Sequence, residues 1–294
     1  MSEFGNISSG ASSFDSFKSN KVVSGTKDFL ESNSLVAKVA FLLLVLVVFV
    51  IAVKFSARFM SWVFSYNKSP YLFDGMVDAK TMMVIPQDPN DSGSIPIIRS
   101  DDQSNGVEFT YSVWMFIDDL VYQNGQYKHV FHKGNDDINL STNPIGMNHP
   151  NNGPGLYIAP NTNALVVVMN TFNNIQEKVV IDDIPINKWV CVQIRVENHQ
   201  LDVYINGKLA KRLILKGVPK QNYGDVYVAM NGGFSGYMSE LRYFNYGLGT
   251  AQIQRIVDNG PNLEMSGDSA ITKSMPKYLS LRWFFTGNKD AYNP

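Results

Sequence analysis

Alternating apolar and polar residues predict three consecutive antiparallel strands within Ile186–Leu215. In Trp189–Glu197, valine and isoleucine occupy every second position, which is the pattern of a strand with one buried face. The alternation returns in Leu201–Ile205, after a short polar turn at Asn198–Gln200. Asn206-Gly207 then predicts a two-residue hairpin turn, because both residues tolerate the positive φ angles of a type I′ turn. The pattern leaves open how the third strand pairs beyond this turn.

A second pattern, the apolar run from Leu35 to Phe55, predicts a membrane-spanning helix. As a helix, Leu35–Val53 would span about 28 Å, which is close to the hydrocarbon thickness of a bilayer. A helix that is apolar on every face cannot bury all of its surface by packing against one side of a β domain. We therefore predict a membrane anchor over residues 35–57. Side chains expected to face lipid are Leu35, Phe41, Leu44, Val48, Ile51 and Phe55.

A cleaved signal peptide is the alternative for this run, with Val50-Ile51-Ala52 as its cleavage site. The polar leader of roughly 35 residues is longer than that of a typical signal peptide, which favours a retained single-pass anchor. Lysine and arginine residues lie on both sides of the run, so the positive-inside rule leaves the membrane orientation open.

The rest of the chain divides by composition. Residues 1–34 are rich in Ser, Gly, Asn and Lys and are predicted to form a disordered polar tail. Residues 58–80 are predicted to form a juxtamembrane helix and linker. From 81 to 260, Pro, Gly, Asn and Asp separate short runs of β-forming residues, which predicts a β-sandwich. Residues 261–294 are interpreted as a C-terminal tail with an aromatic docking segment.

Further strands and one helix are predicted within this sandwich. Thr250 is expected to cap the helix, and Gly260-Pro261 to end it. The predicted strands outside Ile186–Leu215 are Thr81–Ile85, Ile95–Arg99, Glu108–Ile117, His129–Lys133, Gly155–Ile158, Ala164–Asn170, Val226–Met230 and Tyr237–Tyr246.

Charge and cysteine content narrow the classes of partner. The chain has 25 basic and 26 acidic side chains, so the composition shows no excess of positive charge and nucleic acid is not an expected partner. Cys191 is the single cysteine, which excludes an intrachain disulfide. A sizeable β domain without disulfides suits a reducing compartment.

Five blocks of residues occur in the order found in one known family. They are FTYSVWMFIDD (Phe109–Asp119), HVFHKG (His129–Gly134), GLYIAP (Gly155–Pro160), NKWVCVQIRVENHQLDVYING (Asn187–Gly207) and GGFSGYMSELRYFNYGLGTAQIQRI (Gly232–Ile256). Together they resemble laminin-G-like, or concanavalin A-like, lectin/glucanase domains. The resemblance implies a mainly β jelly roll of two antiparallel sheets, one of them concave, with the last block forming a strand beside the first.

The wider layout carries a narrower resemblance. Its further blocks are IPQDP (Ile85–Pro89), IIRSDDQSNGVEFTYSVW (Ile97–Trp114) and YLSLRWFF (Tyr278–Phe285). One anchor followed by this domain resembles membrane-anchored proteins of large DNA viruses that infect algae and protists. This implies a minor capsid protein of the virion, placed between the inner membrane and the capsid shell, with a capsid protein as its partner.

Glycosidase chemistry is not supported by the carboxylates. Glucanases of the resembled family use two Glu and one Asp on one strand, spaced E-x-D-x-E or E-x-D-x-x-E. Alternation then places the acid and the nucleophile on one face of the sheet. This spacing does not occur in the sequence, so we expect a protein that is not an enzyme.

Calcium is kept as a hypothesis at the loop that contains Asp136 and Asp137. Their carboxylates, with Asn135 and Asn139 nearby, are the oxygen ligands that calcium prefers. Asn and Asp also gather in loops because their side chains hydrogen-bond to turn backbone. Ser239 stands where the resembled family often has Asp in its G-x-I-D-E-x-R block. No other cofactor is expected.

Two histidines on one predicted strand and three aromatic residues near the end of the sequence are also candidates for a binding role. His129 and His132 lie three apart on a predicted strand, so they are expected to face opposite sides and to share no metal ion. Trp283, Phe284 and Phe285 follow a polar linker near the end of the chain. They either dock on the sandwich or bind a partner, since clustered aromatic residues make effective binding hot spots.

Two functions from different classes remain. In the first, the chain is a membrane-anchored structural adaptor whose sandwich binds another protein. In the second, it is a membrane-displayed lectin whose concave face binds carbohydrate. The missing catalytic spacing, the weak calcium signal and the absence of disulfides favour the adaptor.

Overall fold

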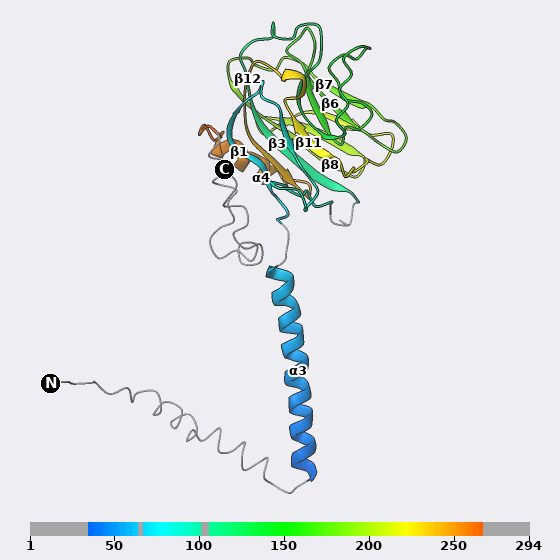
Figure 1. Cartoon of the computed structure of the whole chain (residues 1–294), viewed down its shortest axis with the longest axis vertical. Coiled ribbons are helices and arrows are strands. Elements are labelled where there is room, and N and C mark those ends of the chain that lie inside the picture. Colours follow the sequence, from blue (N-terminus) through cyan, green and yellow to red (C-terminus); the bar gives the residue numbers. More distant parts are fainter. Residues whose placement is uncertain (1–34, 64–66, 101–105, 267–294) are drawn as a thin grey trace, which may run out of the picture. The chain divides into compact units, whose positions relative to one another are not determined.

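The computed structural model of the chain describes residues 35–63, 67–100 and 106–266 (Figure 1). The predicted polar tail (residues 1–34) lies outside the described residues, as do Trp283, Phe284 and Phe285. The chain divides into two units, Met1–Tyr66 and Asn67–Pro294. Within the described residues, the first unit contains one helix and the second contains every strand.

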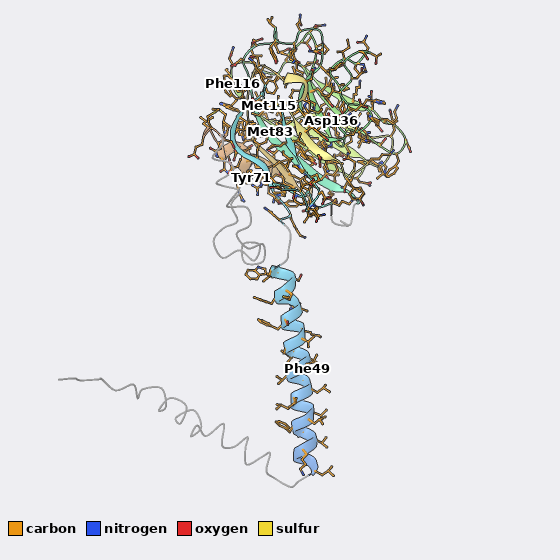
Figure 2. All side chains as sticks on the ribbon, in the orientation of Figure 1. Phe49, Tyr71, Met83, Met115, Phe116 and Asp136 are labelled. Carbon is orange, nitrogen blue, oxygen red and sulfur yellow. The ribbon has the colours of Figure 1, made fainter. Side chains whose placement is uncertain are left out.

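The first unit contains helix α3, which runs from Leu35 to Val63. Its segment Lys38–Val63 is long and apolar enough to cross a membrane, and no residue of its most apolar stretch is buried within the structure. Leu44 is 59% exposed and Ile51 62% exposed. Side chains such as Phe49 project from the helix on all sides (Figure 2). The prediction of one apolar N-terminal helix that could span a membrane is therefore confirmed.

Of the side chains predicted to face lipid, Phe41 is half-buried. The others are exposed on α3: Leu35, Leu44, Val48, Ile51 and Phe55. The helix continues past residue 57 and includes Phe59 and Trp62, whose ring centroids lie 6.0 Å apart. Aromatic residues at the end of an apolar span favour the boundary between lipid and water.

The second unit is a sandwich of two six-stranded antiparallel sheets, as the alternation and the resemblance predicted. Sheet A has the order β1 (Tyr71–Asp78), β12 (Gly236–Phe244), β3 (Glu108–Ile117), β8 (Trp189–Glu197), β9 (Gln200–Ile205) and β10 (Lys208–Ile214). Sheet B has the order β2 (Met83–Ile85), β11 (Asp225–Val228), β4 (Lys128–Gly134), β5 (Gly155–Ile158), β6 (Leu165–Met169) and β7 (Glu177–Ile181). The other elements are the 3₁₀ turn η1 (Met230–Gly232) and helix α4 (Thr250–Asn259).

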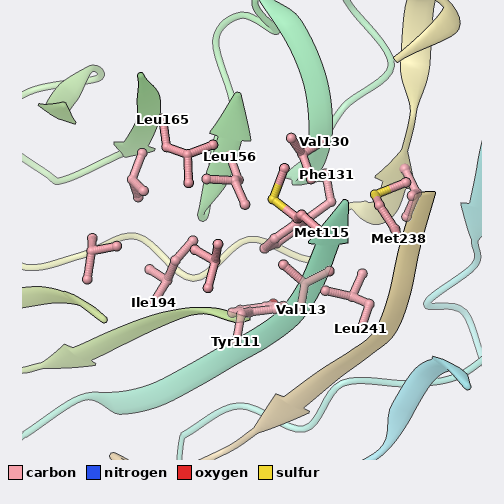
Figure 3. Packing of buried hydrophobic residues seen from close by; sticks show 14 of the residues in the cluster. Tyr111, Val113, Met115, Val130, Phe131, Leu156, Leu165, Ile194, Met238 and Leu241 are labelled. Atoms are coloured by element: carbon pink, nitrogen blue, oxygen red, sulfur yellow. The ribbon is translucent and has the colours of Figure 1, made fainter. Parts of the chain in front are cut away.

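The hydrophobic core fills the space between the sheets (Figure 3). Tyr111, Val113 and Met115 point into it from β3, at every second position of the strand. Phe131 and Leu156 meet them from sheet B. This packing follows from period-two alternation, because the outer face of each strand is left for other residues.

The hairpin at Asn206-Gly207 settles the register that the sequence leaves open. Both residues have positive φ angles, 49° and 79°, and Ile205 pairs with Lys208. A two-residue turn therefore joins β9 to β10, in agreement with the Asn-Gly signal. A bulge follows between Leu209 and Lys211, and β10 is an exposed edge strand of sheet A. Lysine on an exposed edge discourages pairing with another chain.

The observed elements differ from the predicted ones at four places. Tyr71–Asp78, inside the predicted linker 58–80, forms strand β1, so the sandwich begins before residue 81. Two register shifts break its alternation and hide it from a pattern search. Ile95–Arg99 is not a strand, whereas Glu177–Ile181 is the unpredicted strand β7. Helix α4 is capped at Gly249, whose N–H donates to Oε1 of Gln252, rather than at Thr250.

Candidate functional site

The outer face of sheet B is covered by the long connection between β4 and β5, residues 135–154. Tyr157 and Val168 point out of the sheet and pack with Met147 of this connection. All three side chains are buried. The connection therefore occupies the surface on which a concave ligand-binding face would lie.

Buried amide side chains hold this cover in place. Nδ2 of Asn152 donates to the carbonyl oxygen of Asn148 at 2.8 Å, and its Oδ1 accepts from the Tyr157 hydroxyl at 2.5 Å. The backbone N–H of Asn152 donates to Oδ1 of Asn170, whose Nδ2 donates to the Pro150 carbonyl. Asn148 and Asn152 are fully buried, so each of these bonds satisfies a group that water cannot reach.

Replacing Asn152 by Leu is expected to lower the free energy of unfolding by about 3 kcal/mol, because two or more buried polar groups then lose their partners. Urea unfolding of the full chain in a mild detergent measures the change. Asn151→Ala is the matched control, because the Asn151 side chain has no hydrogen bond within the described residues; we expect it to change stability by less than about 0.5 kcal/mol. A loss below about 1 kcal/mol for Asn152→Leu would contradict the role given to this network.

His129 and His132 lie on the same face of sheet B, contrary to the prediction that they face opposite sides. A bulge between His129 and Phe131 inserts one extra residue into β4 and reverses the alternation. Nε2 of His129 and Nδ1 of His132 are consequently 2.7 Å apart. Both rings are buried beneath the connection, between Tyr157 and Tyr227.

The hydrogen bonds of this pair fix its protonation. The Met230 N–H can only donate, so Nδ1 of His129 accepts at 3.1 Å and Nε2 carries the proton. That proton is donated to His132, whose Nε2–H is left to donate to the Asn135 carbonyl at 3.0 Å. Both rings are neutral in this chain. Burial lowers the pKa of His132 to about 4, and burial together with the neighbouring ring lowers the pKa of His129 well below its usual value.

Helix α4 covers part of the outer face of sheet A. Tyr204 of β9 and Phe244 of β12 point outward and form a buried cluster with Leu248 and Ile253. Nε2 of Gln193 donates to the Ile253 carbonyl at 3.3 Å. The part of this face beneath α4 is therefore filled by the protein itself.

An open pocket remains at one end of the sandwich, between the two sheets. We call it the end pocket; the residues that define it are Arg99, Phe109, Tyr111, Lys133, Gln221 and Tyr243. Its volume is about 110 Å³. It lies where β3 begins and where β4 and β12 end, so both sheets contribute to its walls. Ile97 and Arg99, with the loop before β11, form its rim.

The floor of the end pocket is aromatic. The ring centroids of Tyr111 and Tyr243 lie 5.0 Å apart, and those of Phe109 and Tyr111 lie 6.0 Å apart in an edge-on arrangement. The Tyr243 hydroxyl donates to the Ile98 carbonyl at 2.9 Å, which ties the rim to the floor. An apolar floor of this kind suits the body of a ligand, with polar groups at the rim fixing its orientation.

The polar groups of the end pocket are mainly donors. The Lys133 ammonium donates to the Gly224 carbonyl, and burial lowers its pKa to about 8, opposed by the nearby Asp225 carboxylate. Arg99 lies over the ring of Tyr223, 4.5 Å from its centroid, and forms no ion pair within the described residues. Nε2 of Gln221 is buried without a hydrogen-bond partner among the residues that the structure describes.

No pattern in the sequence marks the residues of the end pocket as a group. The residues lie in segments that are far apart in the sequence, from Arg99 to Tyr243, so a local motif cannot contain them. One signal was present in β4, where Lys133 shares the inward face of Phe131. A lysine at an inward position of a strand needs a partner or an opening to water, because an isolated buried charge is costly.

Two other depressions have a different character. A recess of about 40 Å³ beside α4, which includes Trp114 and Glu240, is large enough for only a few water molecules. An open depression of about 360 Å³ lies over the β4–β5 connection, and its lining includes Asn143, Pro144 and Gln176. The second depression is open, and amide side chains are prominent in its lining.

The calcium hypothesis rests on two exposed carboxylates. Asp136 and Asp137 lie on the surface of the β4–β5 connection. Among the described residues, no group of three or more His, Cys, Asp or Glu side chains could hold a metal ion. Nearby amide oxygens have other roles: Oδ1 of Asn135 accepts from the Asn151 N–H, and Oδ1 of Asn148 accepts from the Asp137 N–H. Calcium binding at this loop stays a prediction.

The two antiparallel sheets, the strand order and the capping helix define a lectin-like β-sandwich. The sequence profile described as the concanavalin A-like lectin/glucanases superfamily matches residues 90–254, more than half of the chain. The chain belongs to this superfamily. A comparison with curated protein sequences finds no match.

Several solved structures are similar to the chain. One is the ligand-binding domain of botulinum neurotoxin serotype D in complex with N-acetylneuraminic acid, with 13% identity and a TM-score of 0.46, over 67% of this chain and 44% of that chain. Another is the receptor-binding domain of botulinum neurotoxin D, with 11% identity and a TM-score of 0.47, over 66% and 45%. A third is the receptor-binding domain of the C/D mosaic serotype, with 14% identity and a TM-score of 0.40, over 52% and 36%. The chain spans less than half the length of each of these proteins.

Proposed function

We propose that this chain is a membrane-anchored, non-catalytic adaptor: helix α3 holds it in a bilayer and the sandwich binds another protein. The observation that carries the proposal is the exposed apolar surface of α3, in the same chain as a sandwich of the concanavalin A-like lectin/glucanases superfamily. Because the β4–β5 connection and helix α4 each cover part of an outer sheet face, the end pocket is the recess through which we propose that the sandwich binds a partner.

The nature of the partner follows from the resemblance in layout. Membrane-anchored proteins of large DNA viruses of algae and protists have a single anchor followed by a domain of this kind. A capsid protein is therefore the proposed partner, and the chain would be a minor capsid protein that links the inner membrane of the virion to its shell. Absence of the E-x-D-x-E spacing supports a role in binding rather than in hydrolysis.

Amine-reactive crosslinking followed by mass spectrometry, on particles or membranes that carry the chain, tests the adaptor function. We expect exposed lysines of the sandwich, such as Lys188 and Lys208, to be linked to one other protein in repeated preparations. Crosslinks that join sandwich lysines only to the chain itself would contradict the proposal.

A carbohydrate-binding function is the second candidate, and the open depression over the β4–β5 connection favours it. The amides of Asn143 and Gln176 can both donate to and accept from sugar hydroxyls. A glycan array, probed with the full chain in detergent with and without calcium, separates the candidates. Binding that is lost on chelation would support the lectin and the calcium site at Asp136 and Asp137 together.

A further inference from the structure

The end pocket places three side-chain donors around an aromatic floor. Lys133 reaches it from sheet B, Arg99 from the segment before β3, and Gln221 from the loop before β11. Lys133 and Arg99 carry positive charge, and Nε2 of Gln221 is buried with no acceptor among the described residues. A buried donor without a partner costs free energy that a bound acceptor would recover.

Among the described residues that line the end pocket, none is aspartate or glutamate. The negative charge nearest to Lys133 is the Asp225 carboxylate, which lies behind the pocket wall and already accepts from the Gln87 N–H at 2.8 Å. The amides of Gln87 and Asn222 are already used, since Oε1 of Gln87 accepts from the Ile97 N–H and Oδ1 of Asn222 accepts from the Gly224 N–H. Sugar hydroxyls need acceptors as well as donors, whereas a carboxylate accepts only.

We propose that the end pocket binds a carboxylate of the partner protein that lies next to an apolar or aromatic side chain, as it does at an apolar or aromatic C-terminal residue. This inference rests on the proposed adaptor function and specifies the chemistry of its contact. The carboxylate would lie between Lys133, Arg99 and the free amide of Gln221, and its apolar body would lie on Phe109, Tyr111 and Tyr243. Charge-assisted hydrogen bonds of this kind are about twice as strong as neutral ones.

Saturation-transfer NMR of the full chain in nanodiscs, with phenylacetate as the probe, tests the pocket directly. Phenylacetamide is the neutral probe of the same shape, and we expect it to bind at least about tenfold more weakly. Lys133→Met should weaken phenylacetate binding by a similar factor, whereas Lys208→Met, on the exposed edge strand β10, should leave it unchanged. Equal binding of the two probes would overturn the proposal.

Two further measurements protect the test against a misfolded variant. Gln221→Glu places a negative charge at the half-buried rim and should abolish phenylacetate binding while the far-ultraviolet spectrum is unchanged. In the unaltered chain, binding should weaken severalfold between pH 7 and pH 9, because burial lowers the pKa of Lys133 to about 8 and the ammonium is lost above it. Unchanged binding in both measurements would overturn the proposal.

Glucuronate, used as a third probe, separates a protein carboxylate from an acidic sugar as the ligand of the pocket. If glucuronate binds tenfold more tightly than phenylacetate, the pocket serves an acidic sugar, and the assignment to a protein carboxylate is overturned. Amine-reactive crosslinking of particles that carry the Lys133→Met variant is independent of the binding measurements. If the sandwich of this variant is still crosslinked to the partner protein, the role of the pocket is overturned and the adaptor function stands.

Discussion

Two aspartates in the middle of α3, Val48→Asp with Ile51→Asp, are expected to release the chain from membranes. Both side chains are exposed on the apolar helix, at 56% and 62%. Each aspartate at the centre of a membrane helix costs about 3 kcal/mol of insertion free energy, so the pair costs on the order of 6 kcal/mol. Extraction of membranes with alkaline carbonate measures the result: the unaltered chain should stay in the pellet and the double variant should move to the supernatant.

The control for this experiment is Val48→Ala with Ile51→Ala, which removes similar volume at the same positions without adding charge. We expect the alanine variant to remain in the pellet. If the aspartate variant also remained there, the helix would not be the membrane anchor.

Acidification is expected to destabilise the sandwich through the pair of buried histidines. Both are neutral in the folded state, and the pKa of His132 falls to about 4 because of burial. An unfolded histidine binds a proton near pH 6.5, so between pH 6.5 and 4 the unfolded state holds more protons. Stability is therefore complete above pH 6.5 and is lost as the pH falls through this window. His132 alone accounts for about 3 kcal/mol at pH 4, and His129 adds to the loss in the same direction.

Urea unfolding at pH 7, 6 and 5, in a detergent that does not titrate, measures this slope. His199→Gln, which changes an exposed histidine outside the pair, should leave the slope unchanged. Replacement of the pair by His129→Leu and His132→Phe should flatten it. A constant free energy of unfolding from pH 7 to pH 5 in the unaltered chain would contradict the buried neutral pair.

Patterns of local residues were enough to predict most of the fold. Alternation located β3, β8 and β9, Asn206-Gly207 located the hairpin, and uninterrupted apolar composition located α3. Each of these features depends on residues within a few positions of one another. Strand β1 was hidden because two register shifts interrupt its alternation.

The site depends on features that the sequence does not display. One extra residue in β4 brings His129 beside His132, and whether a strand contains a bulge is decided by its neighbours. The end pocket combines segments as distant as Arg99 and Gln221, and only the closing of the two sheets brings them together. The sequence could indicate that Lys133 was unusual, because its alternation with Phe131 places a charge toward the core.

Phase separation of a non-ionic detergent on warming tests the central claim, that an apolar helix anchors this β-sandwich to a lipid surface, most directly. The full-length chain is expected to collect in the detergent phase, since α3 exposes a membrane-length apolar surface. Recovery of the full-length chain in the aqueous phase would contradict the account.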